Sequence, residues 1–315
     1  KIKLSDGNEL IVSENQPFMV INSYGEREWR KAKDLKQGDY VAFVLKLPEG
    51  ESQKIEWWNH VNNTFVNKDG KWLPLLEYKG DLNDVRVAYS STKQNMSKMK
   101  EIKLPTKTTP QLLEFLGFMY SEGCISNEEV SISNTDERIR SRIKTLLIDL
   151  FGFEKKRVAE YEDKIVVYSK MLAEYLKKML GFPEGKKGEH MQISPMIFRC
   201  SKNEIIKFLE AYLDGDGTVA FSKEGYPTFR YFSISKKALL GIKVLLATLG
   251  IRSKIEPWVT KISKLWMLEI LDGHGRKAFY EIVKPYKQRK KLDDYFKNYP
   301  EIKNSVPLPI NKLLK

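Results

Sequence analysis

Two segments of the chain, residues 112–119 and 206–213, carry apolar residues three and four positions apart. This spacing places the apolar side chains on one stripe, so both segments are predicted to be amphipathic helices. Start signals precede both helices. Thr109 stands before Pro110, a residue that favours the first helical turn, and residues 201–204 have the sequence of a capping box. Each helix is predicted to end in an acidic residue followed by a glycine.

The pattern downstream of each helix is repeated. In both cases the chain continues with two short alternating segments, a second amphipathic helix ending at a glycine, another alternating pair and a third helix. Setting Glu122 against Asp216 gives an offset of 216 − 122 = 94 between the two helices, and farther downstream VSISNTD from Val130 matches FSISKK from Phe232. Five matching segments in the same order predict an internal duplication of an α+β unit.

The first hundred residues have a different pattern. Short β-type runs with turn signals between them predict a β-rich segment at the start of the chain. We expect five divisions of the chain, namely a β-rich segment at 1–47, a connecting region and candidate ligand contact at 48–105, a first repeated subdomain at 106–200, a second at 201–300 and a C-terminal tail at 301–315.

Charge is unevenly distributed along the chain. The 315 residues carry 54 Lys+Arg and 41 Asp+Glu, a net charge of +13, and residues 106–315 account for 37 basic and 26 acidic residues, a net of +11. A regional basic excess indicates a surface for a polyanion, either nucleic acid or an acidic membrane. A Lys- and Glu-rich thermophilic surface would give the same totals.

Composition also bears on the cellular compartment. No apolar run approaches the length of a membrane span and no charged-then-apolar leader opens the chain, so we expect neither membrane insertion nor secretion. The two cysteines, Cys124 and Cys200, cannot form a disulfide framework, which fits a reducing cytosol.

Small residues lie four positions apart in both predicted helices that end in an acid. They are Gly117 and Ser121 in the first helix, and Ala211 and Gly215 in the second. Such a stripe lets two helix backbones approach closely. If the helices pack along it, Glu122 and Asp216 emerge side by side, where two carboxylates and two negative dipole ends repel each other unless a cation lies between them. Oxygen ligands select a hard divalent ion, and Mg²⁺ is the expected one.

Two simpler explanations of this motif are open. The run Asp214-Gly215-Asp216-Gly217 is similar to the opening of a calcium loop, but Gly225 stands where such a loop needs its last acid. A plain glycine C-cap explains either helix end alone. It does not explain paired acids on a duplicated frame.

The segments LGFMYSEG and LEAYLDGDG resemble the two signature helices of LAGLIDADG homing endonucleases, in the single-chain form with two motifs. The resemblance covers roughly residues 106 to 300. It implies two αββαββα subdomains related by a pseudo-twofold axis, with the motif helices at their interface and a saddle-shaped sheet from each lying in the DNA major groove. It also implies a monomer that makes a metal-dependent double-strand break at a long target, either pseudo-palindromic or asymmetric.

The resemblance also assigns roles to residues. Glu122 and Asp216 take the place of the metal-binding motif acids, with the carbonyls of Ser121 and Gly215 nearby as further ligands, and Mn²⁺ is expected to substitute for Mg²⁺. Asp214 matches a position concerned with helix packing. The family often adds a lysine after the last helix of each half. Here the candidates are Lys290, with Lys287 and Lys291 as rivals, and Lys187, with Lys186 as a rival.

Alternating residues on the predicted hairpins are candidates for DNA contacts, because side chains on one face of a sheet can reach base edges. They are Ser131, Ser133, Asn134, Arg138, Lys223, Arg230, Tyr231 and Ser233.

Residues 1–47 resemble part of an intein splicing domain, including the "DLK.GD.V" strand, and many archaeal inteins carry a LAGLIDADG endonuclease at that place. The splicing motif normally has Thr-x-x-His, whereas this chain has Ser13 and Gln16, and Gln cannot act as an acid or base. We therefore expect an intein-derived endonuclease that does not splice itself, in the cytoplasm of a thermophilic archaeon. An RNA maturase and a decayed, DNA-binding form are the alternatives.

Overall fold

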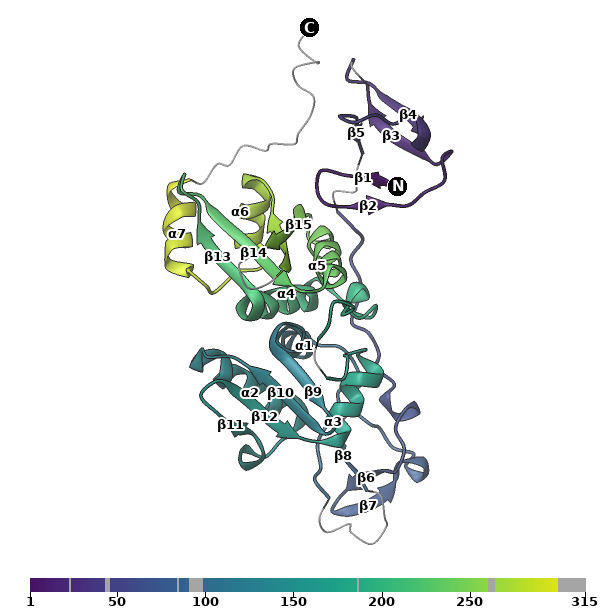
Figure 1. Cartoon of the computed structure of the whole chain (residues 1–315). Coiled ribbons are helices and arrows are strands. Elements are labelled where there is room, and N and C mark those ends of the chain that lie inside the picture. The colour runs from purple at the N-terminus through teal and green to yellow at the C-terminus, as the bar shows by residue number, and fades with distance from the viewer. Residues whose placement is uncertain are drawn as a thin grey trace.

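The computed structural model describes residues 1–22, 24–42, 46–83, 85–90, 99–185, 187–259 and 264–299. Two units with the order αββαββα lie one above the other, and their first helices, α1 (Pro110–Glu122) and α4 (Lys202–Asp216), are sandwiched between the two sheets (Figure 1). The duplicated α+β architecture predicted from the sequence is confirmed.

The first unit has a four-stranded antiparallel sheet in the order β11-β12-β10-β9. After α1 its elements are β9 (Gly123–Ser126), β10 (Glu129–Ser133), α2 (Glu137–Phe151), a 3-10 turn (Lys155–Arg157), β11 (Ala159–Glu160), β12 (Lys164–Tyr168), α3 (Lys170–Glu174) and a π-helical turn (Tyr175–Met179).

The second unit repeats this layout with the sheet order β13-β14-β16-β15. After a 3-10 turn (Ile197–Arg199) and α4, its elements are β13 (Gly217–Phe221), β14 (Pro227–Ser233), α5 (Lys236–Thr248), β15 (Ser253–Val259), β16 (Lys264–Ile270), α6 (Gly273–Ile282) and an added helix α7 (Arg289–Asn298).

Strand alternation explains how both sheets are oriented. In β14, Phe229 and Tyr231 are fully buried against the helices, whereas Arg230 and Phe232 point to the opposite face and are half-buried. Helices α4, α5 and α6 all contact the sheet of the second unit. We call the face of each sheet that points away from its helices the outer face.

The register of the strands corrects one sequence match. Gly123 pairs with Ile132 in the first unit, and Gly217 pairs with Tyr231 in the second, so Ile132 corresponds to Tyr231 with an offset of 231 − 132 = 99. The helix caps Asp136 and Ser235 give the same offset, 235 − 136 = 99. The match of VSISNTD with FSISKK, which set Ser131 against Ser233, was three residues out of register.

The first hundred residues form small antiparallel sheets, as predicted for residues 1–47. The elements there are β1 (Ile2–Lys3), β2 (Glu9–Leu10), β3 (Pro17–Ile21), β4 (Arg27–Lys31), a 3-10 turn (Ala32–Asp34) and β5 (Tyr40–Val41). Residues 48–105 add two 3-10 turns (Trp57–Asn59 and Leu75–Glu77) and the strands β6 (Thr64–Lys68), β7 (Lys71–Pro74) and β8 (Arg86–Tyr89).

The two N-terminal parts attach to different units. Trp57, Val66 and Val87 are fully buried in one continuous core with the repeated units, and β8 packs against α3 of the first unit. The β1–β2 hairpin instead docks on the second unit, where the Nζ of Lys243 lies 2.7 Å from Oδ2 of Asp6. Among the described residues, no helix is long and apolar enough to cross a bilayer.

Candidate metal centre and nucleic-acid interface

The motif helices α1 and α4 are in close contact because glycines stand where they cross. A Cβ on Gly117 would lie 2.5 Å from the carbonyl oxygen of Phe208 and 2.7 Å from the Cβ of Ala211. A Cβ on Gly215 would collide with the side chain of Ser121. The predicted stripe of small residues is therefore the contact surface, and any larger side chain would force the helices apart.

This contact brings the two motif acids together. Glu122 is the last residue of α1 and Asp216 the last residue of α4, and both side chains are half-buried. Burial raises the pKa of Asp216 to about 7, with the negative charge of Glu122 contributing to the rise and two lysines opposing it. Each carboxylate also stands at the negative end of a helix dipole. The pair is therefore a concentrated negative site in a partly desolvated position.

One lysine from each unit closes the C-terminal end of a motif helix. The Nζ of Lys187 donates to the carbonyl oxygens of Met119 (3.4 Å), Tyr120 (3.2 Å) and Ser121. The Nζ of Lys287 donates to those of Leu213 (3.0 Å), Gly215 (3.4 Å) and Gly217 (2.7 Å). The two ammonium groups thus occupy equivalent places, each next to a motif acid, and they add donors at the helix ends, where the carbonyls of Met119 and Leu213 also accept from the amides of Gly123 and Gly217.

Burial changes the acidity of both lysines. Desolvation lowers the pKa of Lys187 to about 8, although Asp216 and Glu122 act to raise it. Desolvation likewise lowers the pKa of Lys287, opposed by Asp214, Asp216 and Glu122. In both lysines the effect of burial on the pKa is larger than the opposing effect of the nearby carboxylates.

In the second unit, the lysine that reaches the end of α4 is not Lys290, the first choice from the sequence. Lys290 is an exposed residue in the first turn of α7, and Lys291 is exposed beside it. Lys287, the predicted rival, is the residue that reaches the motif helix, because the loop before α7 carries it back to α4. The rival in the first half, Lys186, lies outside the described residues. The repeat offsets of 94 and 99 place Lys187 opposite Glu281 and Tyr286, so counting along the repeat does not find Lys287.

The oxygen atoms at the ends of α1 and α4 can be compared with the ligands that a divalent ion prefers. Glu122 and Asp216 offer carboxylate oxygens, which suit Mg²⁺ or Mn²⁺. The carbonyls of Ser121 and Gly215, expected as further ligands, each accept a hydrogen bond from a lysine. Across the described residues, no group of three or more His, Cys, Asp or Glu side chains could hold a metal. The residues fit an ion held by two carboxylates that takes its other ligands from water or a phosphate.

Asp214, predicted to be structural, breaks the symmetry of the two units. Burial raises its pKa to about 6, and its Oδ1 has no hydrogen-bond partner among the described residues. The offset of 94 sets it against Tyr120, whose hydroxyl donates to the carbonyl of Leu180 and accepts from the amide of Ser194. Asp214 therefore has no acidic counterpart in the first unit.

Four of the eight candidate DNA contacts are on an outer face or in an exposed turn. Ser131, Ser133 and Arg230 are on the outer faces, and Lys223 is exposed in the turn between β13 and β14. The prediction of DNA contacts was wrong for Tyr231 and Ser233, because both side chains point to the helix side of β14. Tyr231 is fully buried and its hydroxyl donates to the carbonyl of Leu209, 3.1 Å away.

Three of these candidates have structural partners near helix starts. The Oγ of Ser233 accepts from the amide of Ser235, and the Oδ1 of Asn134 accepts from the amide of Asp136. These are equivalent turns in the two units, each shaping the chain just before a helix cap. Arg138 lies over the ring of Tyr286 in the other unit. Their side chains are therefore engaged within the protein.

The sequence prediction missed several outer-face residues on β15 and β16. Glu269 and Lys254 pair across these strands, and the Nζ of Lys254 lies 2.6 Å from Oε2 of Glu256. Trp258 is 39% exposed, with its ring centroid 6.0 Å from that of Phe232. The alternation of KLWMLEIL contained the signal, since its second, fourth and sixth residues share a face.

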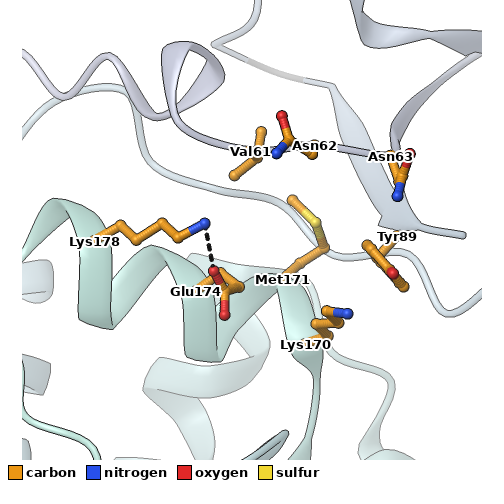
Figure 2. A pocket seen from close by; sticks show the side chains of 8 residues that line it. All are labelled: Val61, Asn62, Asn63, Tyr89, Lys170, Met171, Glu174 and Lys178. Carbon is orange, nitrogen blue, oxygen red and sulfur yellow. Dashed lines mark ion pairs between the residues drawn. The ribbon is translucent and has the colours of Figure 1, made fainter. Parts of the chain in front are cut away.

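A hollow of about 300 Å³ lies between the 48–105 region and α3 (Figure 2). Two lysines line it, and both are engaged. The Nζ of Lys178 lies 2.7 Å from Oε2 of Glu174, and the Nζ of Lys170 lies 3.7 Å from the centroid of the Tyr89 ring. This hollow belongs to the packing of the 48–105 region on the first unit.

Comparisons with known proteins bear on the second unit and on the whole chain. Residues 203–284 match the family model of a LAGLIDADG-like domain. The probable translation initiation factor IF-2 of Methanocaldococcus jannaschii is 25% identical over 349 aligned positions, covering 100% of this chain and 29% of that protein. A subunit of the A-type ATP synthase of Pyrococcus abyssi is 29% identical over 254 positions, covering 80% of this chain and 20% of that protein.

A third relative and a solved structure complete the comparison. The DNA-directed RNA polymerase subunit Rpo1C of Methanocaldococcus jannaschii is 27% identical over 290 positions, covering 90% of this chain and 30% of that protein. The chain spans less than a third of the length of each of these relatives. The crystal structure of I-DmoI in complex with DNA and Mn aligns with 55% of this chain and 96% of its own, at 16% identity and a TM-score of 0.40. The family model covers residues 203–284, and this segment of the chain is similar to a LAGLIDADG-like domain.

Proposed function

We propose that the chain is a divalent-metal-dependent endonuclease that makes a double-strand break at a long DNA target, acting as a monomer. The observation that carries this proposal is the paired site at the ends of α1 and α4. Two motif acids, Glu122 and Asp216, come from equivalent positions, and the negative charge of Glu122 helps to raise the pKa of Asp216. Lys187 and Lys287 flank them in equivalent contacts. A duplex has the same approximate twofold symmetry in its backbone, so one such site can serve both strands.

The residues divide the work of phosphodiester hydrolysis. Glu122 and Asp216 would hold the ion, Mg²⁺ by expectation with Mn²⁺ as a substitute. A bound divalent ion lowers the pKa of a water molecule and offsets charge on the phosphate. Lys187 and Lys287 would present N–H donors beside the position a phosphate would take, and the nearby carboxylates oppose the fall in pKa that burial causes in both lysines. The net charge of +13 favours approach to DNA.

We also infer an intein-derived origin in the cytoplasm of an archaeon. A translation factor, an ATP synthase and an RNA polymerase have unrelated activities, yet each includes a segment similar to 80% or more of this chain. A segment shared by unrelated proteins is best explained as an insertion with a function of its own. Gln16 lacks an acid or base group, so the chain fused between two reporter domains should yield no ligated product. A ligated product would contradict this prediction.

The test of the main proposal is incubation of the chain with a randomised duplex pool and Mg²⁺, followed by sequencing of the ends. An endonuclease yields breaks at one recurring sequence, and EDTA abolishes them. A pool that stays intact but is retained by the protein would favour the DNA-binding alternative. A pool that is neither cut nor bound, with retention of structured RNA instead, would favour the maturase and overturn the proposal.

A further inference from the structure

The two sheets can be compared position by position, because their hydrogen-bond registers are equivalent. In each unit, one row of outer-face residues begins two positions after the motif acid. In the first unit this row is Cys124, Ser131, Val166 and Ala159. In the second unit it is Thr218, Arg230, Glu269 and Lys254.

The two rows differ in chemistry at every position. The first row contains no charged side chain, whereas the second has charges in the order plus, minus, plus on three adjacent strands. The next row toward the start of α2 and α5 also differs, since Ser133 and Lys164 in the first unit correspond to Phe232 and Met267 in the second. The outer faces therefore cannot make the same contacts to the same bases.

Arg230 is the residue on these rows best prepared to read a base. Its Nη2 donates to Oε1 of Glu269 at 3.3 Å, and its guanidinium lies 5.9 Å from the ring centroid of Trp258. Its side chain is 28% exposed, and its Nε has no acceptor among the described residues. A guanidinium held at one side by a carboxylate and packed on a ring loses less freedom when it binds, and Arg pairs with the O6 and N7 of guanine.

We propose that Arg230, positioned by Glu269, specifies a guanine in the half-site read by the outer face of the second unit. This inference rests on the proposed DNA-binding function. At the equivalent place in the first unit, Ser131 has a short hydroxyl side chain and no charged neighbour in its row. We therefore expect no preference for guanine at the equivalent base position of the other half-site. The target is then asymmetric at these two positions.

The experiment is selection of bound duplexes from a randomised library by the full chain, with Ca²⁺ in place of Mg²⁺ to hold back cleavage. It is repeated with Arg230→Ala and with Ser131→Ala as the matched control. The parent should enrich guanine at one position whose mirror position lacks that preference. Arg230→Ala should lose this preference alone, and its affinity for the parental site should fall roughly 5- to 150-fold.

The controls separate a reading role from a structural one. Ser131→Ala should keep the guanine preference, and Glu269→Gln should weaken it without abolishing it, with the melting temperature of each variant measured in parallel. A palindromic selected site, or an Arg230→Ala variant with every preference intact, overturns the inference while the proposed function stands. If the parent enriches no sequence, the proposed function and this inference fail together.

Discussion

The two units present matching groups where α1 meets α4 and unlike groups on the outer faces of their sheets. At the helix contact each has a small residue at the crossing, an acid at the helix end and a lysine on the last carbonyls. The inner faces of the sheets are also alike, since Ile132 and Tyr231, and Ile165 and Leu268, are buried apolar or aromatic pairs at equivalent positions. On the outer faces, the matched positions of the paired rows carry different residues.

This difference separates two requirements on a duplicated fold. Packing of the motif helices and the proposed metal centre constrain both copies equally, so symmetry persists there. The outer faces contribute little to the core and are free to diverge. A DNA duplex likewise has a symmetric and an asymmetric part, because its backbone is nearly twofold symmetric and its base sequence is not.

The largest expected effect comes from removing either motif acid. Asp216→Asn and Glu122→Gln should each lower the rate of cleavage of cognate DNA by about 10³-fold or more, because a neutral side chain binds a divalent ion weakly. Single-turnover cleavage in Mg²⁺ measures the rate, and binding in Ca²⁺ should remain largely intact. If one variant still cuts at the parental rate, the acids are not equivalent and the assignment of the metal site is wrong.

The flanking lysines should have a smaller effect of equal size in the two units. Lys187→Met and Lys287→Met should each slow cleavage by about 10- to 10³-fold, because each removes a charged donor beside the phosphate site. Lys290→Met is the matched control, since this residue is exposed on α7 rather than directed at the end of a motif helix, and its rate should be unchanged. A large loss in Lys290→Met with none in Lys287→Met would restore the first choice made from the sequence.

The motif helices and the order of elements were predictable because both depend on local spacing. Helical stripes, caps and the repeated acid could be read from residues near each other in sequence. The centre was also predictable, since the offset of 94 aligned Glu122 with Asp216. What failed depended on register. Ser131 and Ser233 share the letters SIS, but the hairpin of the second unit is longer, so equal letters stand at unequal places in the two sheets.

The same limit explains why Tyr231 was expected on the wrong face and why Lys290 was ranked above Lys287. A strand with bulky residues on both faces, such as β14, does not reveal from its composition which face meets the helices, and a one-residue shift exchanges the two faces. Lys287 was ranked below Lys290 because nothing local shows where a loop returns to another helix. These are contacts between segments about 70 residues apart.

The helix crossing gives a test of the symmetric centre through stability. Gly117→Ala should destabilise the protein by about 1–3 kcal/mol, because its Cβ would press on the backbone of Phe208 and on Ala211, and neither can move without separating the helices. Gly188→Ala is the control, since its Cβ would meet no atom within 4 Å. Urea unfolding measures both. An unchanged midpoint for Gly117→Ala would show that the helices are not in such close contact.

The smallest expected effect is on the stability of the metal-free protein. Asp216→Asn should increase this stability, whereas the same substitution should lower the rate of cleavage. The folded pKa of Asp216, about 7, lies above its ordinary value of 3.8. Stability that depends on its proton is therefore fully present below about pH 4 and is lost as the pH rises to about 7. Asp216→Asn keeps a neutral side chain at every pH. In EDTA at pH 8 it should be more stable than the parent by about 1–2 kcal/mol, after allowance for solvent screening of this half-buried group.

Urea unfolding at pH 8 and at pH 4 separates this effect from a general change in packing. The gain of Asp216→Asn should shrink at pH 4, where the parent carboxyl is protonated, and it should shrink at pH 8 when Mg²⁺ is added, because the ion relieves the repulsion only in the parent. A gain that is the same under all three conditions would mean that the motif acids do not strain the metal-free protein. The paired charges would then be no evidence for a cation between the two units.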